Sequence, residues 1–368
     1  KNPLAGCQVD GAVALRPGAG PVGGHVYLSS AVARDLVRPI AAARVDDENV
    51  AVQRRDAGKA IGQIALLVVG ENDNRQRQPD AIGIAGAHGV FFQVAAVTGT
   101  AGGSASNLTI NTTGVATVTG AVGTDIGTLT VTNSGGATFQ STVDAATVAI
   151  SDSSASTTVA FQGNLTVTTG MTVANTANAY NVSITGSSNS IAISGNTMVF
   201  GNTGSLTLGD SSSDGFTFGS SSNLGAIIAT APSQINLAGT ITLYGDGSTS
   251  IIGSATGPIV LADDTTYALG SGSSLHSLEI GGTVNGAHSL DVEYNYYVQF
   301  DRAVGNTTPL TSLTVNGANI SMFAGAVTSG NQLYKSYTNL YGTFDTNDSG
   351  TANGSFEVVG AAILGSAT

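Results

Sequence analysis

Short apolar runs recur from about residue 104 to residue 330, and within each run apolar and polar side chains alternate. Examples are Leu108-Thr109-Ile110, Leu129-Thr130-Val131 and Leu165-Thr166-Val167. Such alternation is typical of a β-strand with one buried face and one solvated face. Threonine often takes the solvated position, where an uncharged β-branched side chain suits a pleated surface. The pattern therefore predicts many short strands.

The spacing of these runs predicts how the strands are arranged. Taken two runs at a time, the central polar residues follow one another at short, nearly constant steps: 109 to 130, 130 to 147, 147 to 166, 166 to 183 and 199 to 217. Gly, Asn, Asp and Ser separate the runs, and these residues accept tight bends. A register that persists so far without a recognisable helix favours stacked coils over a sandwich or a barrel. We expect an all-β, right-handed parallel β-helix (β-solenoid) of about a dozen coils, each about 20 residues long.

The repeat also divides the chain. Residues 1–80 lack it, and we expect an irregular head or a small capping segment there, with a short helix over 29–37 and a buried strand over 65–69. Residues 81–343 form the predicted solenoid. Residues 344–368 are expected to be a C-terminal tail or a partial coil, since the pattern weakens after Thr343.

Charge is distributed unevenly between head and repeat. Residues 1–95 carry ten basic and nine acidic groups, whereas residues 96–368 carry two basic and fifteen acidic groups, a net charge of −13. No Lys or Arg occurs between Arg77 and Arg302. Binding to nucleic acid or to anionic lipid requires basic residues, so we expect neither partner for the repeat.

Cys7 is the only cysteine, which excludes a disulfide within one chain. The longest apolar run, residues 64–69, is too short to span a bilayer, so no transmembrane segment is expected. Because the sequence opens with Lys1-Asn2-Pro3, we interpret it as an internal fragment or a processed form.

Four stretches near the C-terminal end carry a family resemblance. They are Gly-Thr-Val-Asn-Gly-Ala-His-Ser-Leu at 282–290, Val-Gln-Phe-Asp-Arg-Ala-Val-Gly at 298–305, Pro-Leu-Thr-Ser-Leu-Thr-Val at 309–315 and Ala-Val-Thr-Ser-Gly-Asn-Gln-Leu-Tyr at 326–334. The sequence of these segments resembles the repeats of filamentous-haemagglutinin-like and autotransporter-like bacterial exoproteins. The resemblance covers residues 282–337, and residues 104–281 only in style. It implies a β-helix on a secreted or outer-surface bacterial protein, and no catalytic residue.

Paired carboxylates are the first candidate for chemistry. Asp291 and Glu293 lie two apart on a predicted strand, so both should face outward, about 7 Å apart. That separation suits the acid and base of glycoside hydrolysis, and Asp301 with Arg302 follows closely. The alternative is a solvated strand face beside a turn. The scarcity of basic residues argues against a lyase that acts on acidic polysaccharides.

A calcium loop is a second candidate. Asp345, Asn347 and their neighbours resemble the start of such a loop, but Glu357 falls one place beyond the position that should close it. The alternative is a polar loop without a cation, and no other cofactor is expected. The four histidines show no zinc-binding spacing: His25, His88, His276 and His288.

Tyr294, Tyr296 and Tyr297 form the third candidate, a patch that stacks on sugars or binds a partner. The alternative is that these rings pack a wider coil. From all of these features we expect a structural and adhesive segment, not an enzyme, that binds host-cell or matrix glycans or proteins, or neighbouring copies. Two other functions stay open: a β-helix enzyme acting on polysaccharides, and a surface-layer or sheath subunit.

Overall fold

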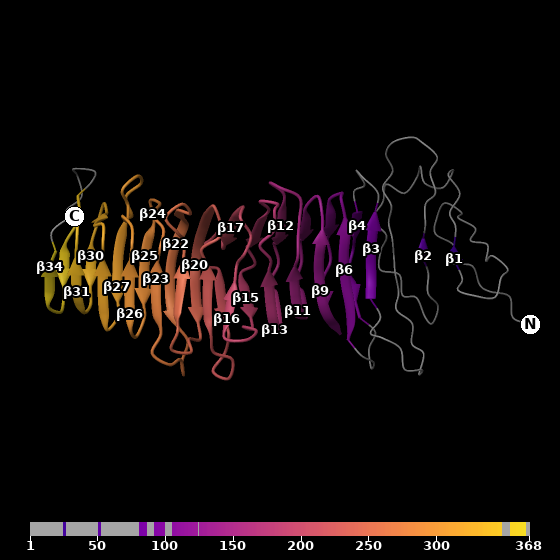
Figure 1. Ribbon diagram of the computed structural model, residues 1–368, viewed down its shortest axis with the longest axis horizontal. Helices are drawn as coiled ribbons and strands as arrows, with labels where there is room; N and C mark the ends of the chain where they lie inside the picture. The colour runs from indigo at the N-terminus through magenta and orange to yellow at the C-terminus, as the bar shows by residue number, and fades with distance from the viewer. Residues whose placement is uncertain are drawn as a thin grey trace, which may run out of the picture.

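The computed structural model describes residues 25–26, 51–52, 81–86, 92–99, 105–123, 125–347 and 354–365. Every regular element in these ranges is a β-strand, and strands stack in parallel in a β-solenoid of about 11 turns. The strands lie side by side along the long axis, from β3 near one end to β34 at the other (Figure 1). The predicted solenoid is therefore confirmed. Among the described residues, no helix is long and apolar enough to cross a membrane.

The coil has three sides, which we call faces 1, 2 and 3 in the order in which the chain visits them. Parallel pairing and isolated bridges link the strands of each face from coil to coil. Face 1 consists of β3 (Ala81–Gly86), β6 (Ser106–Thr112), β9 (Ile126–Asn133), the second halves of β11 (Val143–Ile150) and β13 (Leu165–Val173), β16 (Thr197–Val199), β19 (Ala226–Ala229), β21 (Thr249–Ile252), β23 (Ser277–Ile280), β26 (Tyr297–Phe300), β28 (Asn319–Met322), β31 (Tyr337–Leu340) and β34 (Ala362–Leu364).

Faces 2 and 3 are built in the same way, and two long strands bend from one to the other. Face 2 consists of β4 (Phe92–Val94), β7 (Ala116–Val118), β10 (Ala137–Phe139), β12 (Thr158–Phe161), β14 (Asn181–Ile184), β17 (Ser205–Leu208), the first halves of β20 (Gln234–Leu243) and β22 (Ile259–Leu269), β24 (Val284–Asn285), β29 (Ala326–Val327) and β32 (Phe344–Asp345). Face 3 consists of β5 (Val97–Thr98), β8 (Val122–Gly123), the first halves of β11 and β13, β15 (Ser188–Ile191), β18 (Gly215–Phe218), the second halves of β20 and β22, β25 (Ser289–Glu293), β27 (Ser312–Asn316), β30 (Gln332–Tyr334) and β33 (Phe356–Val358).

The predicted step of two apolar runs from one coil to the next is wrong for most of the solenoid, because most coils have three sides. Thr109 does pair with Thr130, as expected, but Thr130 pairs with Ala149 and Thr166 with Ser190. The third strand of many coils is short or continues around a corner, so a count of apolar runs misses it. Coil length also varies, because the residues between strands form loops of different size.

Inward side chains stack on their equivalents in the next coil and make one continuous core. On face 2 the buried ladder contains Val118, Phe139, Phe161, Ile184, Leu208 and Leu237. Each such side chain contributes about 1.5–3 kcal/mol by burial. The outward positions of the same face form the predicted polar ladder, which includes Thr117, Thr138, Ser183, Thr207 and Asn236.

Gly239 lies at a corner between faces 2 and 3. Gly239 bends β20 with φ = 83°, a backbone angle that favours glycine. A Cβ on Gly239 would lie 2.2 Å from the carbonyl oxygen of Asp214, in the loop of the preceding coil. The same carbonyl accepts the Thr240 N–H at 2.8 Å. The missing side chain therefore lets the loop over residues 209–214 pack directly on this corner.

The two ends of the chain are described in part. In the range predicted as the head, β1 (His25–Val26) and β2 (Ala51–Val52) form a parallel pair, whereas the predicted helix at 29–37 and strand at 65–69 lie outside the described residues. In the range predicted as a tail or partial coil, β32, β33 and β34 pair with β29, β30 and β31.

Candidate functional site

Asp291 and Glu293 both point outward from β25 on face 3, as the alternation predicts. Register pairing places Asp291 beside Thr266 and Thr314 in the neighbouring coils. One carboxylate oxygen of Asp291 is buried and has no hydrogen-bond partner. Burial, and then the charge of Glu293, raises the pKa of Asp291. This carboxyl group is therefore held toward its protonated form.

Glu293 has the opposite environment. Its carboxylate accepts the Lys335 Nζ at 2.5 Å and the Asn316 Nδ2 at 2.7 Å, from the two following coils. Burial acts to raise the pKa of Glu293, but these two hydrogen bonds and the charge of Lys335 together outweigh it, so the pKa is lowered. The pair thus combines one carboxyl group that favours the proton with one that favours ionisation, which is the arrangement found in acid–base pairs.

Asp301 lies apart from that pair. It follows β26 on face 1, and its carboxylate accepts a hydrogen bond from Gln299 at 2.6 Å. Glu279, on the neighbouring strand β23, is its acidic neighbour: burial, and then Asp301, raises the pKa of Glu279. The structure therefore places the three predicted carboxylates on two faces, with Asp301 in a second acidic pair.

The predicted tyrosine patch divides between core and surface. Tyr294 is only 6% exposed, and its ring centroid lies 6.1 Å from that of His276. Tyr296 and Tyr297 make an edge contact outside the core at 4.5 Å, and Tyr297 is 47% exposed. Tyr294 therefore packs in the core, as the alternative interpretation predicted. Only Tyr296 and Tyr297 remain as candidates for a binding surface. Tyr337, two coils beyond Tyr297 on face 1, extends that surface.

The predicted calcium loop is described only in part. The Asp345 carboxylate accepts the backbone N–H of Asn347 at 2.9 Å, which is a local turn. Glu357 is exposed on β33, beside Leu333 of β30. Residues 348–353 lie outside the described ranges, so the proposed calcium site stays a prediction.

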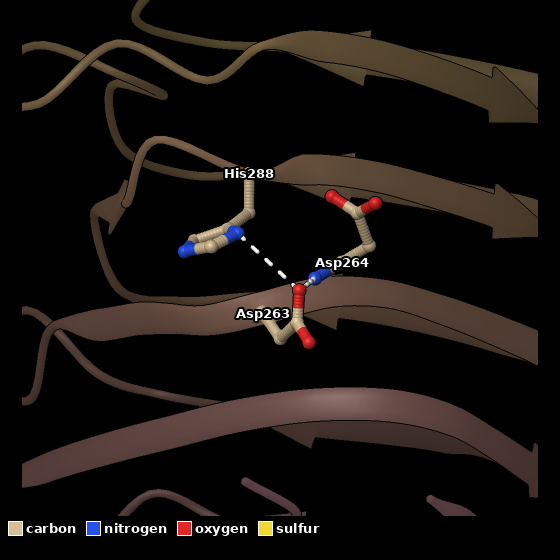
Figure 2. Close-up of side chains that lie close together, drawn as sticks. All are labelled: Asp263, Asp264 and His288. Atoms are coloured by element: carbon tan, nitrogen blue, oxygen red, sulfur yellow. Dashed lines mark hydrogen bonds and ion pairs between the residues drawn. The ribbon is translucent and has the colours of Figure 1, made fainter. Parts of the chain in front are cut away.

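A cluster that the sequence reasoning missed lies at the corner between faces 2 and 3. Donor atoms of Asp263, Asp264 and His288 all lie within 4.8 Å of one another. Figure 2 shows the His288 ring and the Asp264 side chain on either side of the Asp263 carboxylate. The Nδ1 atom of His288 is 3.5 Å from an Asp263 oxygen. These residues do not form a local sequence motif, because the aspartates and the histidine lie in adjacent coils. Predicting the cluster from the sequence would have required the correct register between those coils.

Ser250, His276 and Asp246 also form a chain of polar groups. Ser250 Oγ lies 3.0 Å from His276 Nε2, and His276 Nδ1 lies 3.9 Å from an Asp246 oxygen. Ser250 faces the core, is 1% exposed, and already accepts the Ile227 N–H at 2.9 Å. A nucleophile must be reached by its substrate, so this arrangement is better explained as a buried polar network of the core.

Comparison of the sequence with protein families, curated proteins and solved structures gives no match. The resemblance to exoprotein repeats therefore stays a prediction, and the candidate sites rest on the geometry of this chain alone.

Proposed function

We propose that this chain is a structural and adhesive segment of a secreted or cell-surface bacterial exoprotein. The observation that supports this most is the parallel stacking of β-strands through about 11 turns. Each coil contacts its neighbours through backbone ladders and a continuous core, so the solenoid is a rod that grows by addition. Such a rod can hold a binding surface away from the body to which it is attached.

The surface best suited to contact is on face 1. Tyr297 and Tyr337 are 47% and 37% exposed, and both pair with Asn319 of the strand between them. Two coil spacings separate the two tyrosines, or about 9.6 Å. Aromatic rings offer stacking surface and the amide offers hydrogen bonds, which is the chemistry that sugars and polar protein surfaces accept. Repetition along the rod would add avidity to weak single contacts.

Charge narrows the class of partner. The described solenoid has acidic groups on its surface, and its basic side chains are Arg302 and Lys335, of which Lys335 is bound to Glu293. Neutral glycans and basic protein surfaces therefore suit this chain better than polyanions do. The scarcity of cysteine and the resemblance at residues 282–337 support secretion or surface exposure.

A binding assay on glycan and matrix-protein panels and on cells tests the proposal. We expect weak binding that strengthens when the chain is presented in many copies, and a loss of at least about tenfold in Tyr297→Ser/Tyr337→Ser. Val199→Ser, which removes another exposed apolar side chain of face 1, is the matched control. Absence of binding in every format, or equal binding by the double variant, would contradict the proposed surface.

One observation favours an enzyme acting on polysaccharides as a second candidate. The pKa of Asp291 is raised and that of Glu293 is lowered, on adjacent outward positions of one strand. Turnover of any glycan by the wild-type chain, lost in both Asp291→Asn and Glu293→Gln but kept in Asp144→Asn, would establish this function. Asp144 is an exposed carboxylate of the same face.

A further inference from the structure

We propose that Asp263, Asp264 and His288 bind a divalent first-row transition-metal ion. The proposal is independent of adhesion, because it uses a different part of the rod. It rests on three donor groups of two kinds that the fold brings together at one corner, within 4.8 Å of one another.

The two coils that supply these donors are adjacent. Asp263 and Asp264 lie where β22 bends from face 2 to face 3, and His288 lies directly before β25 at the same corner of the next coil. Pairing on both sides of the corner fixes the two coils against each other: Val260 with Asn285, and Thr265 with Leu290. The donors are therefore positioned by the sheet and not by a free loop.

The distance between two of the donor atoms matches that in a tetrahedral coordination sphere. Bonds of about 2.1 Å from zinc to nitrogen or oxygen place tetrahedral ligand atoms about 3.4 Å apart. His288 Nδ1 and the Asp263 oxygen are 3.5 Å apart. Asp264 is the most exposed of the three residues, so an ion can reach its carboxylate from the solvent.

Backbone amides hold the two carboxylates in place. Asp263 accepts the N–H groups of Ser212 and Asp264, each at 2.8 Å, and Asp264 accepts the N–H of Ser289 at 2.7 Å. The N–H groups of Ser212 and Asp264 favour the ionised form of Asp263, so the pKa of Asp263 is lowered. Each carboxylate oxygen retains a further lone pair for an ion.

The donor set selects the class of metal. Imidazole is a ligand of zinc, copper, nickel and iron, whereas calcium and magnesium take oxygen ligands. Two carboxylates balance the charge of a divalent ion. Three protein ligands leave a position for water, as in open zinc sites. A plain ion pair between His288 and Asp263, without a metal, is the alternative that the zinc titration tests.

Zinc binding to the full-length chain tests the site. The protein is stripped with a chelator, dialysed and titrated with Zn²⁺ by calorimetry, as wild type, His288→Ala, Asp263→Asn, Asp264→Asn and the control Asp144→Asn. The two Asn replacements keep a carbonyl acceptor for the backbone amides. We expect one zinc equivalent to be lost, or weakened more than about tenfold, in each of the three site variants, and to be unchanged in the control.

The comparison between variants is needed because Cys7, His25 and His88 are also potential zinc ligands. Substitution by Co²⁺ gives a second readout, a visible absorption band that should disappear in His288→Ala. Equal stoichiometry and affinity in wild type and His288→Ala would overturn the proposal, as would the absence of any zinc binding by the wild type. Equal circular-dichroism melting curves without metal confirm that the variants are folded.

Discussion

Phe139 and Phe161 stack in successive coils, with ring centroids 5.0 Å apart and ring planes within 7° of each other. They occupy paired positions on β10 and β12, and both are buried. The same coil-to-coil register that aligns the backbones therefore also aligns like side chains in the core.

This stack predicts an energetic coupling between the two coils. Either Phe139→Ala or Phe161→Ala should destabilise the protein by about 3–5 kcal/mol. A double-mutant cycle measured by urea unfolding should give a coupling energy of about 0.5–1.5 kcal/mol. The same cycle for Phe139 and Phe300, which lie in distant coils, should give about zero. Additive effects in the Phe139–Phe161 cycle would show that the stack contributes nothing beyond burial.

The alternation on β13 predicts a large difference between adjacent positions. Val167 is 2% exposed, whereas Thr166 faces outward. Val167→Asp should cost several kcal/mol, since it buries an unpaired charge. Thr166→Asp should cost only about 0.2–1 kcal/mol, because the new carboxylate lies beside Asp144 of the adjacent coil. Similar shifts in the thermal midpoint for both variants would contradict the alternation.

Replacing the corner residue Gly239 should destabilise the protein through a steric clash, in addition to the effect of its backbone angle. Gly239 and Gly195 both have positive φ, but a Cβ would collide with the Asp214 carbonyl only at Gly239; at Gly195 nothing lies within 4 Å. Gly195→Ala should cost about 1–2 kcal/mol from the angle alone. Gly239→Ala should cost about 3 kcal/mol or more. Chemical unfolding of both variants is the measurement, and equal costs would exclude a role for the loop contact.

His276 predicts how stability depends on pH. Burial lowers its pKa in the folded protein, and Asp246 opposes this only in part. In the unfolded chain its pKa is about 6.5. The unfolded chain therefore binds more protons than the folded protein below about pH 6.5, so this residue's contribution to stability is present above that pH and is lost as pH falls.

Urea midpoints at about pH 7.5 and about pH 5 measure this effect. The wild type should lose more stability on acidification than His276→Gln does. Thr138→Ser, which changes an outward side chain of face 2 that does not titrate, is the control and should follow the wild type. A smaller acid loss in the wild type than in His276→Gln would mean that His276 is protonated in the fold and paired with Asp246.

The strands were predictable because their information is local. Leu165, Thr166 and Val167 carry their burial pattern in three consecutive residues, and the structure repeats it. The number of strands per coil was not predictable in this way, because it depends on where the chain bends. Four strands continue around a corner, and counting apolar runs in the sequence does not reveal these bends: β11, β13, β20 and β22.

The candidate sites show the same limit. Asp291 and Glu293 were predicted to face outward from their spacing on one strand, and they do. Lys335 lies 42 positions beyond Glu293, and its ion pair exists only because two coil steps bring it back to the same face. The contact between His288 and Asp263 depends on register in the same way. Contacts between coils require the lengths of the loops, which the periodicity of the sequence does not contain.

The pairing of Val182 with Leu206 has a consequence for how such a gene can change. Excision of residues 182–205 would bring Leu206 into the place of Val182, with the same orientation toward the interior and a matching partner in the preceding turn. Insertions or losses of whole turns would thus preserve the molecule, whereas the loss of a single residue within a strand would invert the later side chains of that strand. Recombination between repeats could therefore adjust the reach of this protein while leaving its cross-section intact.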